Sequence, residues 1–139
     1  MVVPVVYWSG SGNTQKMAEA VAEAINAAGA EAKLMQVSET TADEVAGYSN
    51  IALGCPAMGA EQLEEGEFEP FMAELEASLG GKKVALFGSY GWGGTYMDEW
   101  KARCEGAGAE LACDAVLAMN EPDDDALAAC AELGKAIIA

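Results

Sequence analysis

Short apolar runs alternate with amphipathic stretches along the whole chain. Residues 2–8 form the first apolar run. In the stretch that follows, Met17, Val21 and Ile25 share one helical face, with polar residues largely opposite. The alternation predicts strands at 2–8, 31–37, 50–55, 83–88 and 110–118. It predicts helices at 14–28, 42–46, 68–79, 95–106 and 123–138.

Individual residues mark several ends of these elements. Gly29 is suited to stop the first helix, and Thr41 and Asp123 are suited to cap the helices that follow them. Pro4 does not fit the pattern, because proline removes a backbone donor from what should be an interior strand. We therefore expect Pro4 near the fraying start of the first strand.

The alternation of strands and helices, without a repeat or linker, predicts a single domain over residues 1–139. Its parallel sheet would carry helices on both faces. Ligands of such sheets bind at the carboxyl ends of the strands, where the strand order reverses. A first loop (9–14), a second loop (56–67) and a third loop (89–94) follow predicted strands, and their composition is unusual. This coincidence predicts a binding site built from all three loops.

The first loop has the composition of a phosphate cradle. Its glycines allow a tight turn, and the N–H groups at the start of a helix favour an anion. Because no charged residue occurs before Lys16, the loop would hold a phosphate with neutral donors alone. It matches neither G-x-x-x-x-G-K-[ST] nor G-x-G-x-x-G, and by itself it also fits a plain connection. The predicted phosphate-binding residues are Ser9, Gly10, Ser11, Gly12, Asn13 and Thr14.

The second and third loops add groups that suit a planar ring. Met58 is polarisable, Gly59 can take backbone angles closed to other residues, and Glu61 can accept a hydrogen bond from a ligand N–H. Trp92 can stack on a ring, although together with Tyr90 it also fits an aromatic plug over the strand ends. The other acidic residues of the second loop are typical of a solvated face.

The composition supports a folded protein and restricts its partners. Of the 139 residues 52% are hydrophobic, and 23 acidic residues against 7 basic ones give a formal net charge of −16. This charge disfavours DNA, RNA and anionic membrane surfaces as partners. It favours proteins with basic docking surfaces, because opposite fields speed encounter.

The chain contains no histidine, which removes the commonest general base and a favoured metal ligand. Its cysteines form no C-x-x-C pair, so we expect neither a zinc site nor a dithiol motif, but buried thiols suited to a reducing, cytoplasmic compartment. The apolar start lacks a basic n-region and a cleavage site, and no run approaches membrane-spanning length. The cysteines are Cys55, Cys104, Cys113 and Cys130.

The three loops together resemble those of the short-chain flavodoxins, small electron carriers that bind flavin mononucleotide (FMN). The resemblance extends from the first strand to the helix predicted at 95–106. It implies an α/β fold with a doubly wound, five-stranded parallel sheet in the order 2-1-3-4-5. The matching segments are Tyr7-Trp8-Ser9-Gly10-Ser11-Gly12-Asn13-Thr14, Gly54-Cys55-Pro56-Ala57-Met58-Gly59-Ala60-Glu61 and Phe87-Gly88-Ser89-Tyr90-Gly91-Trp92-Gly93.

The resemblance also implies roles for individual residues. The first loop would bind the phosphate, and Met58 and Trp92 would flank the two faces of the isoalloxazine ring. Glu61 would accept from ring N3, and the Ser89–Gly91 backbone would contact the pyrimidine end. On reduction the Met58–Gly59 peptide would turn over, so that the Gly59 carbonyl accepts a hydrogen bond from the proton gained at N5. The cofactor-binding residues expected from these two loops are Pro56, Ala57, Met58, Gly59, Glu61, Ser89, Tyr90, Gly91 and Trp92.

The function implied is a low-potential one-electron carrier. Non-covalently bound FMN would shuttle between quinone, semiquinone and hydroquinone and pass electrons between redox partner proteins. We expect a monomer that is not an enzyme. Acidic residues near the ring would make the potential low, because they disfavour the anionic hydroquinone. An FMN-dependent quinone reductase stays an alternative, although no long insertion is present to build a substrate pocket. A binding module that has lost its flavin is a further alternative.

Other functions of this architecture lack the residues that they need. A phosphoacceptor receiver needs an aspartate at the end of the third strand and a lysine at the end of the fourth. Those ends carry Gly54-Cys55 and Gly88-Ser89. A low-molecular-weight phosphatase needs an arginine that closes a cysteine loop, but no arginine occurs before Arg103. A serine hydrolase needs a histidine.

Overall fold

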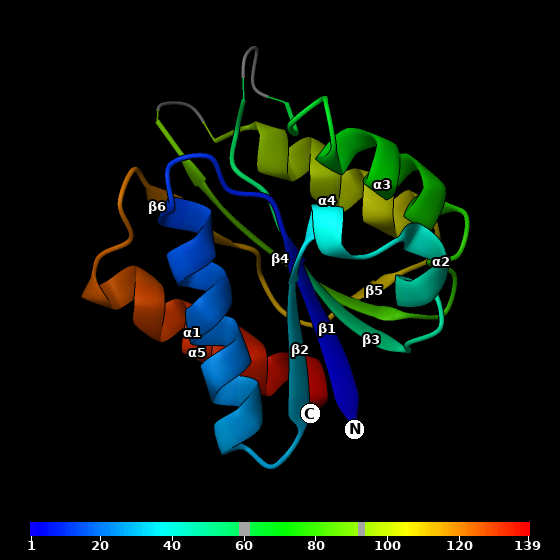
Figure 1. Ribbon diagram of the computed structural model, residues 1–139, viewed down its shortest axis with the longest axis horizontal. Coiled ribbons are helices and arrows are strands. Elements are labelled where there is room, and N and C mark those ends of the chain that lie inside the picture. The colour runs from blue at the N-terminus through cyan, green and yellow to red at the C-terminus, as the bar shows by residue number, and fades with distance from the viewer. Residues whose placement is uncertain (59–61, 92–93) are drawn as a thin grey trace.

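The computed structural model describes residues 1–58, 62–91 and 94–139. Its strands form one sheet in which every pair is parallel. The order is β2-β1-β3-β4-β5, and β6 also pairs with β4 (Figure 1), which confirms the predicted fold class and strand order. The strands are β1 (Val2–Tyr7), β2 (Glu31–Gln36), β3 (Asn50–Gly54), β4 (Lys83–Tyr90), β5 (Glu110–Leu111) and β6 (Val116–Met119).

Helices cover both faces of the sheet. One face packs on α1 (Asn13–Ala27) and α5 (Asp124–Ile138). The other packs on α2 (Ala42–Val45), α3 (Phe68–Glu76) and α4 (Tyr96–Gly106), as Figure 1 shows. Alternate residues of a strand point to opposite faces. Val5, Ala52 and Phe87 therefore join the α1/α5 core, whereas Val6, Leu53 and Leu86 join the other. A short 3₁₀ turn, η1 (Val37–Glu39), follows β2.

The predicted helix ends are confirmed in atomic detail. Gly29 has a φ of +96° after α1, and its N–H donates to the Asn26 carbonyl while the Ala30 N–H donates to the Ile25 carbonyl. These two hydrogen bonds form a Schellman motif, which needs the left-handed backbone conformation that glycine adopts most easily. The Thr41 hydroxyl accepts from the Glu44 N–H at 3.2 Å. The Asp123 carboxylate likewise accepts from the Ala126 N–H at 2.8 Å.

The fifth predicted strand differs from the expectation, because it is split into β5 and β6. Val84 pairs with Leu111, but Phe87 pairs with Val116, so the edge chain advances five residues while β4 advances three. Two residues of the edge chain are therefore left without a partner in β4, and they form a bulge. A bulge of this kind ends one ladder and starts another, which hydrophobic alternation alone does not reveal.

Pro4 does not lie at a fraying end, contrary to the expectation. It is buried and pairs in register with Lys33, and β1 is paired with β2 from Val2 onward. The pairing of β1 with β3 begins only at Val5. The missing N–H of Pro4 therefore falls where the β3 ladder has not yet started, and this position tolerates proline.

The cysteines are free thiols. Burial raises the pKa of Cys55, Cys104 and Cys130 to about 12, which keeps these thiols protonated at neutral pH. Cys113, in the segment between β5 and β6, is partly exposed. Within the described part of the chain, no helix combines the length and the apolar character needed to cross a membrane.

The strand order reverses between β1 and β3. The chain leaves β1 toward α1 on one face of the sheet, and it leaves β3 toward α3 on the other face (Figure 1). The loops that follow these two strands therefore diverge at the carboxyl edge. Such a switch point leaves room for a ligand between the loops.

Candidate functional site

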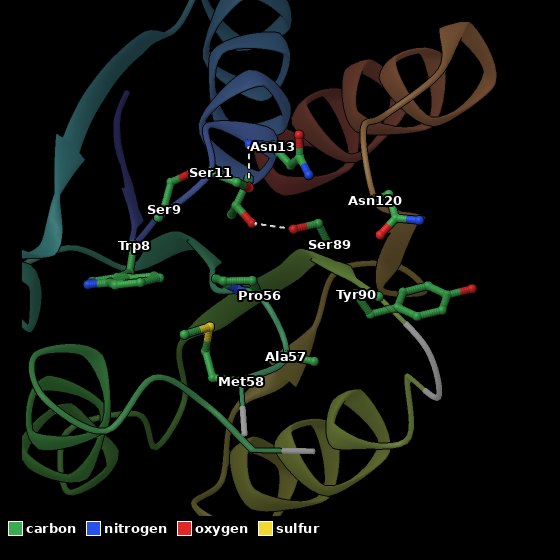
Figure 2. Close-up of a pocket in the computed structure, with 13 residues that line it drawn as sticks. Trp8, Ser9, Ser11, Asn13, Pro56, Ala57, Met58, Ser89, Tyr90 and Asn120 are labelled. Carbon is green, nitrogen blue, oxygen red and sulfur yellow. Dashed lines mark hydrogen bonds between the residues drawn. The ribbon is translucent and has the colours of Figure 1, made fainter. Parts of the chain in front are cut away.

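The carboxyl edge carries a pocket of about 450 Å³ between the first, second and third loops. Small-molecule sites span roughly 300–1,000 Å³. In Figure 2 the side chains of the first loop lie at one end, with Trp8 and Pro56 on one side and Tyr90 on the other. The lining residues are Trp8, Ser9, Gly10, Ser11, Asn13, Thr14, Pro56, Ala57, Met58, Ser89, Tyr90, Gly91 and Asn120.

The pocket thus brings together predicted residues from all three loops. Gly12 is predicted but does not line it. Its φ of +96° instead turns the chain into α1, a conformation that glycine adopts readily. Trp8 and Asn120 line the pocket without having been predicted. The predicted residues Gly59, Glu61 and Trp92 lie outside the described residues.

The first loop is organised by its own hydroxyl groups. The Ser9 Oγ accepts from the backbone N–H of Gly12 at 3.1 Å and of Gln15 at 3.3 Å, and the Ser11 Oγ accepts from the Asn13 N–H at 3.5 Å. Ser9 therefore shapes the loop as an acceptor, and its own hydroxyl hydrogen stays available as a donor.

Several backbone donors of the first loop are left for a ligand. The N–H groups of Gly10, Ser11 and Thr14 have no acceptor among residues 1–58, 62–91 and 94–139. Unpaired N–H groups at the start of a helix attract an anion, and the helix dipole adds to the attraction. This donor set fits a phosphate group.

A buried hydrogen bond joins the first loop to the third. Thr14 and Ser89 are almost completely buried, and their hydroxyl oxygens lie 2.9 Å apart. Figure 2 shows this contact as a dashed line under the first loop. Either hydroxyl can donate in this bond. The direction of the bond can therefore reverse when a ligand accepts a hydrogen bond from one of the two hydroxyls.

None of the described lining residues carries a formal charge at neutral pH. Lys16, in the first turn of α1, has its Nζ 2.6 Å from an oxygen of Glu121. The described part of the pocket therefore offers only neutral donors to a ligand. Hydrogen bonds to a charged group are worth about 1.5–3 kcal/mol each, so several converging N–H and O–H groups can hold an anion without a basic side chain.

The start of the second loop is held by residues from other elements. The Cys55 N–H donates to the Phe87 carbonyl at 3.1 Å, and the Tyr96 hydroxyl donates to the Cys55 carbonyl at 2.8 Å. A Cβ on Gly88 would lie 2.1 Å from that carbonyl oxygen and 2.2 Å from the tyrosine oxygen. Only glycine at residue 88 lets β4 lie this close to the Cys55 carbonyl and the Tyr96 hydroxyl.

Further backbone hydrogen bonds position the second loop beside the pocket. The Ala57 N–H donates to the Ser89 carbonyl at 2.9 Å. Met58 and Gln62 exchange two backbone bonds, at 2.8 and 3.1 Å, across residues 59–61. Met58 is 38% exposed at the pocket, so its apolar side chain offers a surface to a ligand.

Glu64 organises the end of the second loop. Its carboxylate accepts from the backbone N–H of Gly66 at 2.8 Å, Glu67 at 2.8 Å and Phe68 at 2.9 Å, just where α3 begins. Burial acts to raise the pKa of this carboxyl group, but the three N–H donors outweigh burial and lower the pKa. Glu64 is therefore ionised at neutral pH and caps α3.

Two lining residues escaped the sequence reasoning. The hydrophobic pattern places Trp8 in the first strand, but β1 ends at Tyr7, so Trp8 belongs to the loop. Asn120 has a left-handed φ of +58°, and its N–H donates to the Tyr90 carbonyl at 2.7 Å. A signal was present, because this asparagine lies two residues after the end of the last predicted strand, at the carboxyl edge.

The family model described as Flavodoxin matches residues 5–134. The chain is 49% identical to a flavodoxin of Megasphaera elsdenii over 97% of both chains. It is 47% identical to one of Clostridium beijerinckii over 96% of both. The chain belongs to the flavodoxin family. The solution structure of two-electron reduced Megasphaera elsdenii flavodoxin superimposes with a TM-score of 0.88 at 47% identity, covering 99% of this chain and 98% of that one.

Membership of the flavodoxin family establishes the cofactor class and the function. Flavodoxins bind FMN and transfer electrons, and the close relatives are electron carriers and not enzymes. The carrier is therefore supported over the quinone reductase that the sequence left as an alternative. Its redox partners are oxidoreductases. Flavodoxins are standard examples of ligand binding at the switch point of a doubly wound sheet, and the pocket lies at that point.

Proposed function

We propose that the pocket at the carboxyl edge is the FMN site of this chain. The observation that carries the proposal is that one pocket joins unpaired backbone donors of the first loop to apolar and aromatic groups of the other two. FMN needs both, because its phosphate is an anion and its ring system is planar and largely apolar. When bound, FMN supplies the ability to accept and donate electrons one at a time.

The first loop would hold the phosphate. Unpaired N–H groups of Gly10, Ser11 and Thr14 face no protein acceptor in the described ranges, and the Asn13 amide and the Ser9 hydroxyl add side-chain donors. Gly12 would contribute by forming the turn that starts α1, without contacting the phosphate through a side chain.

The second and third loops would hold the ring. Met58 offers an apolar face from the second loop, and Trp92 would supply the opposite face from the third. Glu61 would accept from ring N3, and the backbone from Ser89 to Gly91 would contact the pyrimidine end. The Gly59 carbonyl would accept a hydrogen bond from the N–H that forms at N5 on reduction. The remaining contacts are proposed for Pro56, Ala57 and Tyr90.

The carrier would work at low potential and dock on basic surfaces of its partners. The net charge of −16 supports both points. Negative charge near the ring disfavours a further negative charge on it, and it attracts a basic partner over a distance of roughly 8 Å at physiological salt. We further propose that the chain acts as a monomeric, single-domain protein of the cytoplasm.

A reductive titration followed by absorbance tests the site and the function together. The purified chain should carry one FMN per molecule and take up electrons in two separate one-electron steps. Direct oxidation of a reduced nicotinamide should be almost absent without a reductase. A chain that stays colourless and does not take up added FMN would contradict the proposal.

The role of Glu61 is tested separately by Glu61→Gln. Removing this carboxylate should make the second one-electron potential less negative, because less negative charge then opposes the anionic, fully reduced flavin. An unchanged or more negative potential would exclude the role proposed for Glu61.

A further inference from the structure

A hydrogen bond links the pocket wall to a residue outside the pocket. The Trp8 indole Nε1–H donates to the Glu67 Oε1 at 3.1 Å. Trp8 lines the pocket on the side of the first loop, whereas Glu67 does not line it. The bond therefore joins the segment after β1 to the segment before α3, which lie on either side of the switch point.

The indole packs directly on the first loop. A Cβ added to Gly10 would lie 3.0 Å from the Cη2 atom and 3.2 Å from the Cζ3 atom of Trp8. These atoms belong to the six-membered ring, so this ring covers the Cα of Gly10. The ring thus occupies the space next to Gly10 that a side chain would fill, and it limits how far the loop can shift toward the indole.

The backbone of Glu67 is held in place by its neighbours. The Glu64 carboxylate accepts from the backbone N–H groups of Glu67 and Phe68, at 2.8 and 2.9 Å, and the Phe68 side chain is completely buried in the core. The acceptor of the indole bond is thus mounted on the capped start of a helix. Because the backbone below this carboxylate is already ordered, the indole bond has to restrict only the Glu67 side chain.

We propose that Glu67 and Trp8 form a positioning pair for the phosphate loop. Glu67 orients the indole, the indole supports Gly10, and the supported loop presents its N–H groups to the phosphate. A residue outside the pocket thereby sets the affinity for the phosphate-bearing flavin. The inference rests on the proposed placement of the phosphate at the first loop.

The test compares two ligands that differ only in the phosphate, FMN and riboflavin. Each is titrated into the full-length chain from which flavin has been removed, and the dissociation constant is measured. Glu67→Gln and Glu67→Ala lose the same charge, but only the glutamine keeps an oxygen that can accept from the indole. We expect Glu67→Ala to bind FMN roughly two- to tenfold more weakly than Glu67→Gln, with equal riboflavin affinities.

Trp8→Phe keeps a ring near Gly10 but removes the donor. The difference in FMN affinity between the two Glu67 variants should therefore disappear in the Trp8→Phe background. Glu74, exposed on α3, provides the matched control. Glu74→Gln and Glu74→Ala should bind FMN equally.

The outcomes separate the positioning pair from the placement of the phosphate. Equal FMN affinities for the two Glu67 variants would overturn the inference, as would a loss shared by FMN and riboflavin, since that indicates a general structural effect. If the unmodified chain bound riboflavin as tightly as FMN, the proposed phosphate site itself would be wrong and the inference would fall with it.

Discussion

The first loop is shaped mainly by its own side chains, whereas the start of the second loop is held by other elements. In the first loop, hydroxyl oxygens of Ser9 and Ser11 accept from backbone N–H groups no more than six residues away. Just before the second loop, the Cys55 carbonyl accepts from Tyr96, which lies 41 residues further along the chain. The two loops line one pocket but depend on different parts of the sequence.

This difference predicts how each loop responds to substitution. A locally bonded loop keeps its shape as long as its own residues and the start of its helix are intact. A loop held by distant residues changes shape when strands or helices far away in sequence are altered. Variants of Gly88 or Tyr96, outside the second loop, should therefore disturb it more than distant variants disturb the first loop.

The largest effect is expected for Gly88→Ala. The new Cβ would overlap the Cys55 carbonyl and the Tyr96 hydroxyl, and backbone must move to relieve the overlap. We expect a loss of about 3 kcal/mol in the free energy of unfolding, measured with urea. Gly106→Ala, in α4 with open space around its Cβ, is the control and should stabilise the protein by about 0.5–1 kcal/mol. Equal stability of the two variants would contradict the role given to Gly88.

A smaller loss is expected where the first loop does depend on a distant residue. Thr14→Val leaves the buried Ser89 hydroxyl without its partner, and we expect it to lower the free energy of unfolding by about 2 kcal/mol. Adding Ser89→Ala should recover part of this loss, because both polar groups are then gone. Strictly additive losses in the double-mutant cycle would show that the two hydroxyls do not interact.

Tyr96→Phe tests the distant support of the second loop without adding volume. The buried Cys55 carbonyl loses a donor, so the free energy of unfolding should fall by about 1.5 kcal/mol in urea unfolding. Tyr48 provides the control, because its hydroxyl has no hydrogen-bond partner within the described ranges. A loss for Tyr48→Phe as large as that for Tyr96→Phe would exclude the hydrogen bond as the cause.

The smallest effect concerns the locally bonded end of the second loop. Glu64→Ala removes the cap of α3 and should cost about 1 kcal/mol at neutral pH. Because the pKa of Glu64 is lowered in the folded state, this stabilisation is complete above the unfolded-state pKa and is lost as the pH falls through the folded-state pKa. Urea unfolding of both proteins at several pH values measures it. A difference that stays constant down to strongly acidic pH would disprove the capping role.

The sequence by itself determined the features that depend on near neighbours. The alternation of apolar runs and amphipathic helices predicted the parallel sheet, because periods of two and about 3.6 residues are local properties. The caps at Thr41 and Asp123 and the stop at Gly29 were predicted for the same reason. Glycines and hydroxyls between a strand and a helix were enough to locate the first loop.

Only the tertiary structure decided the features that depend on distant partners. The bulge between β5 and β6 follows from the register with β4, and hydrophobic pattern carries no information about register when both faces of a sheet are buried. The Tyr96 bond to Cys55, the Trp8 bond to Glu67 and the place of Asn120 at the pocket all join segments that meet only after the sheet has formed. A side chain's partner across the switch point is set by how helices pack on the sheet, which no short window of sequence contains.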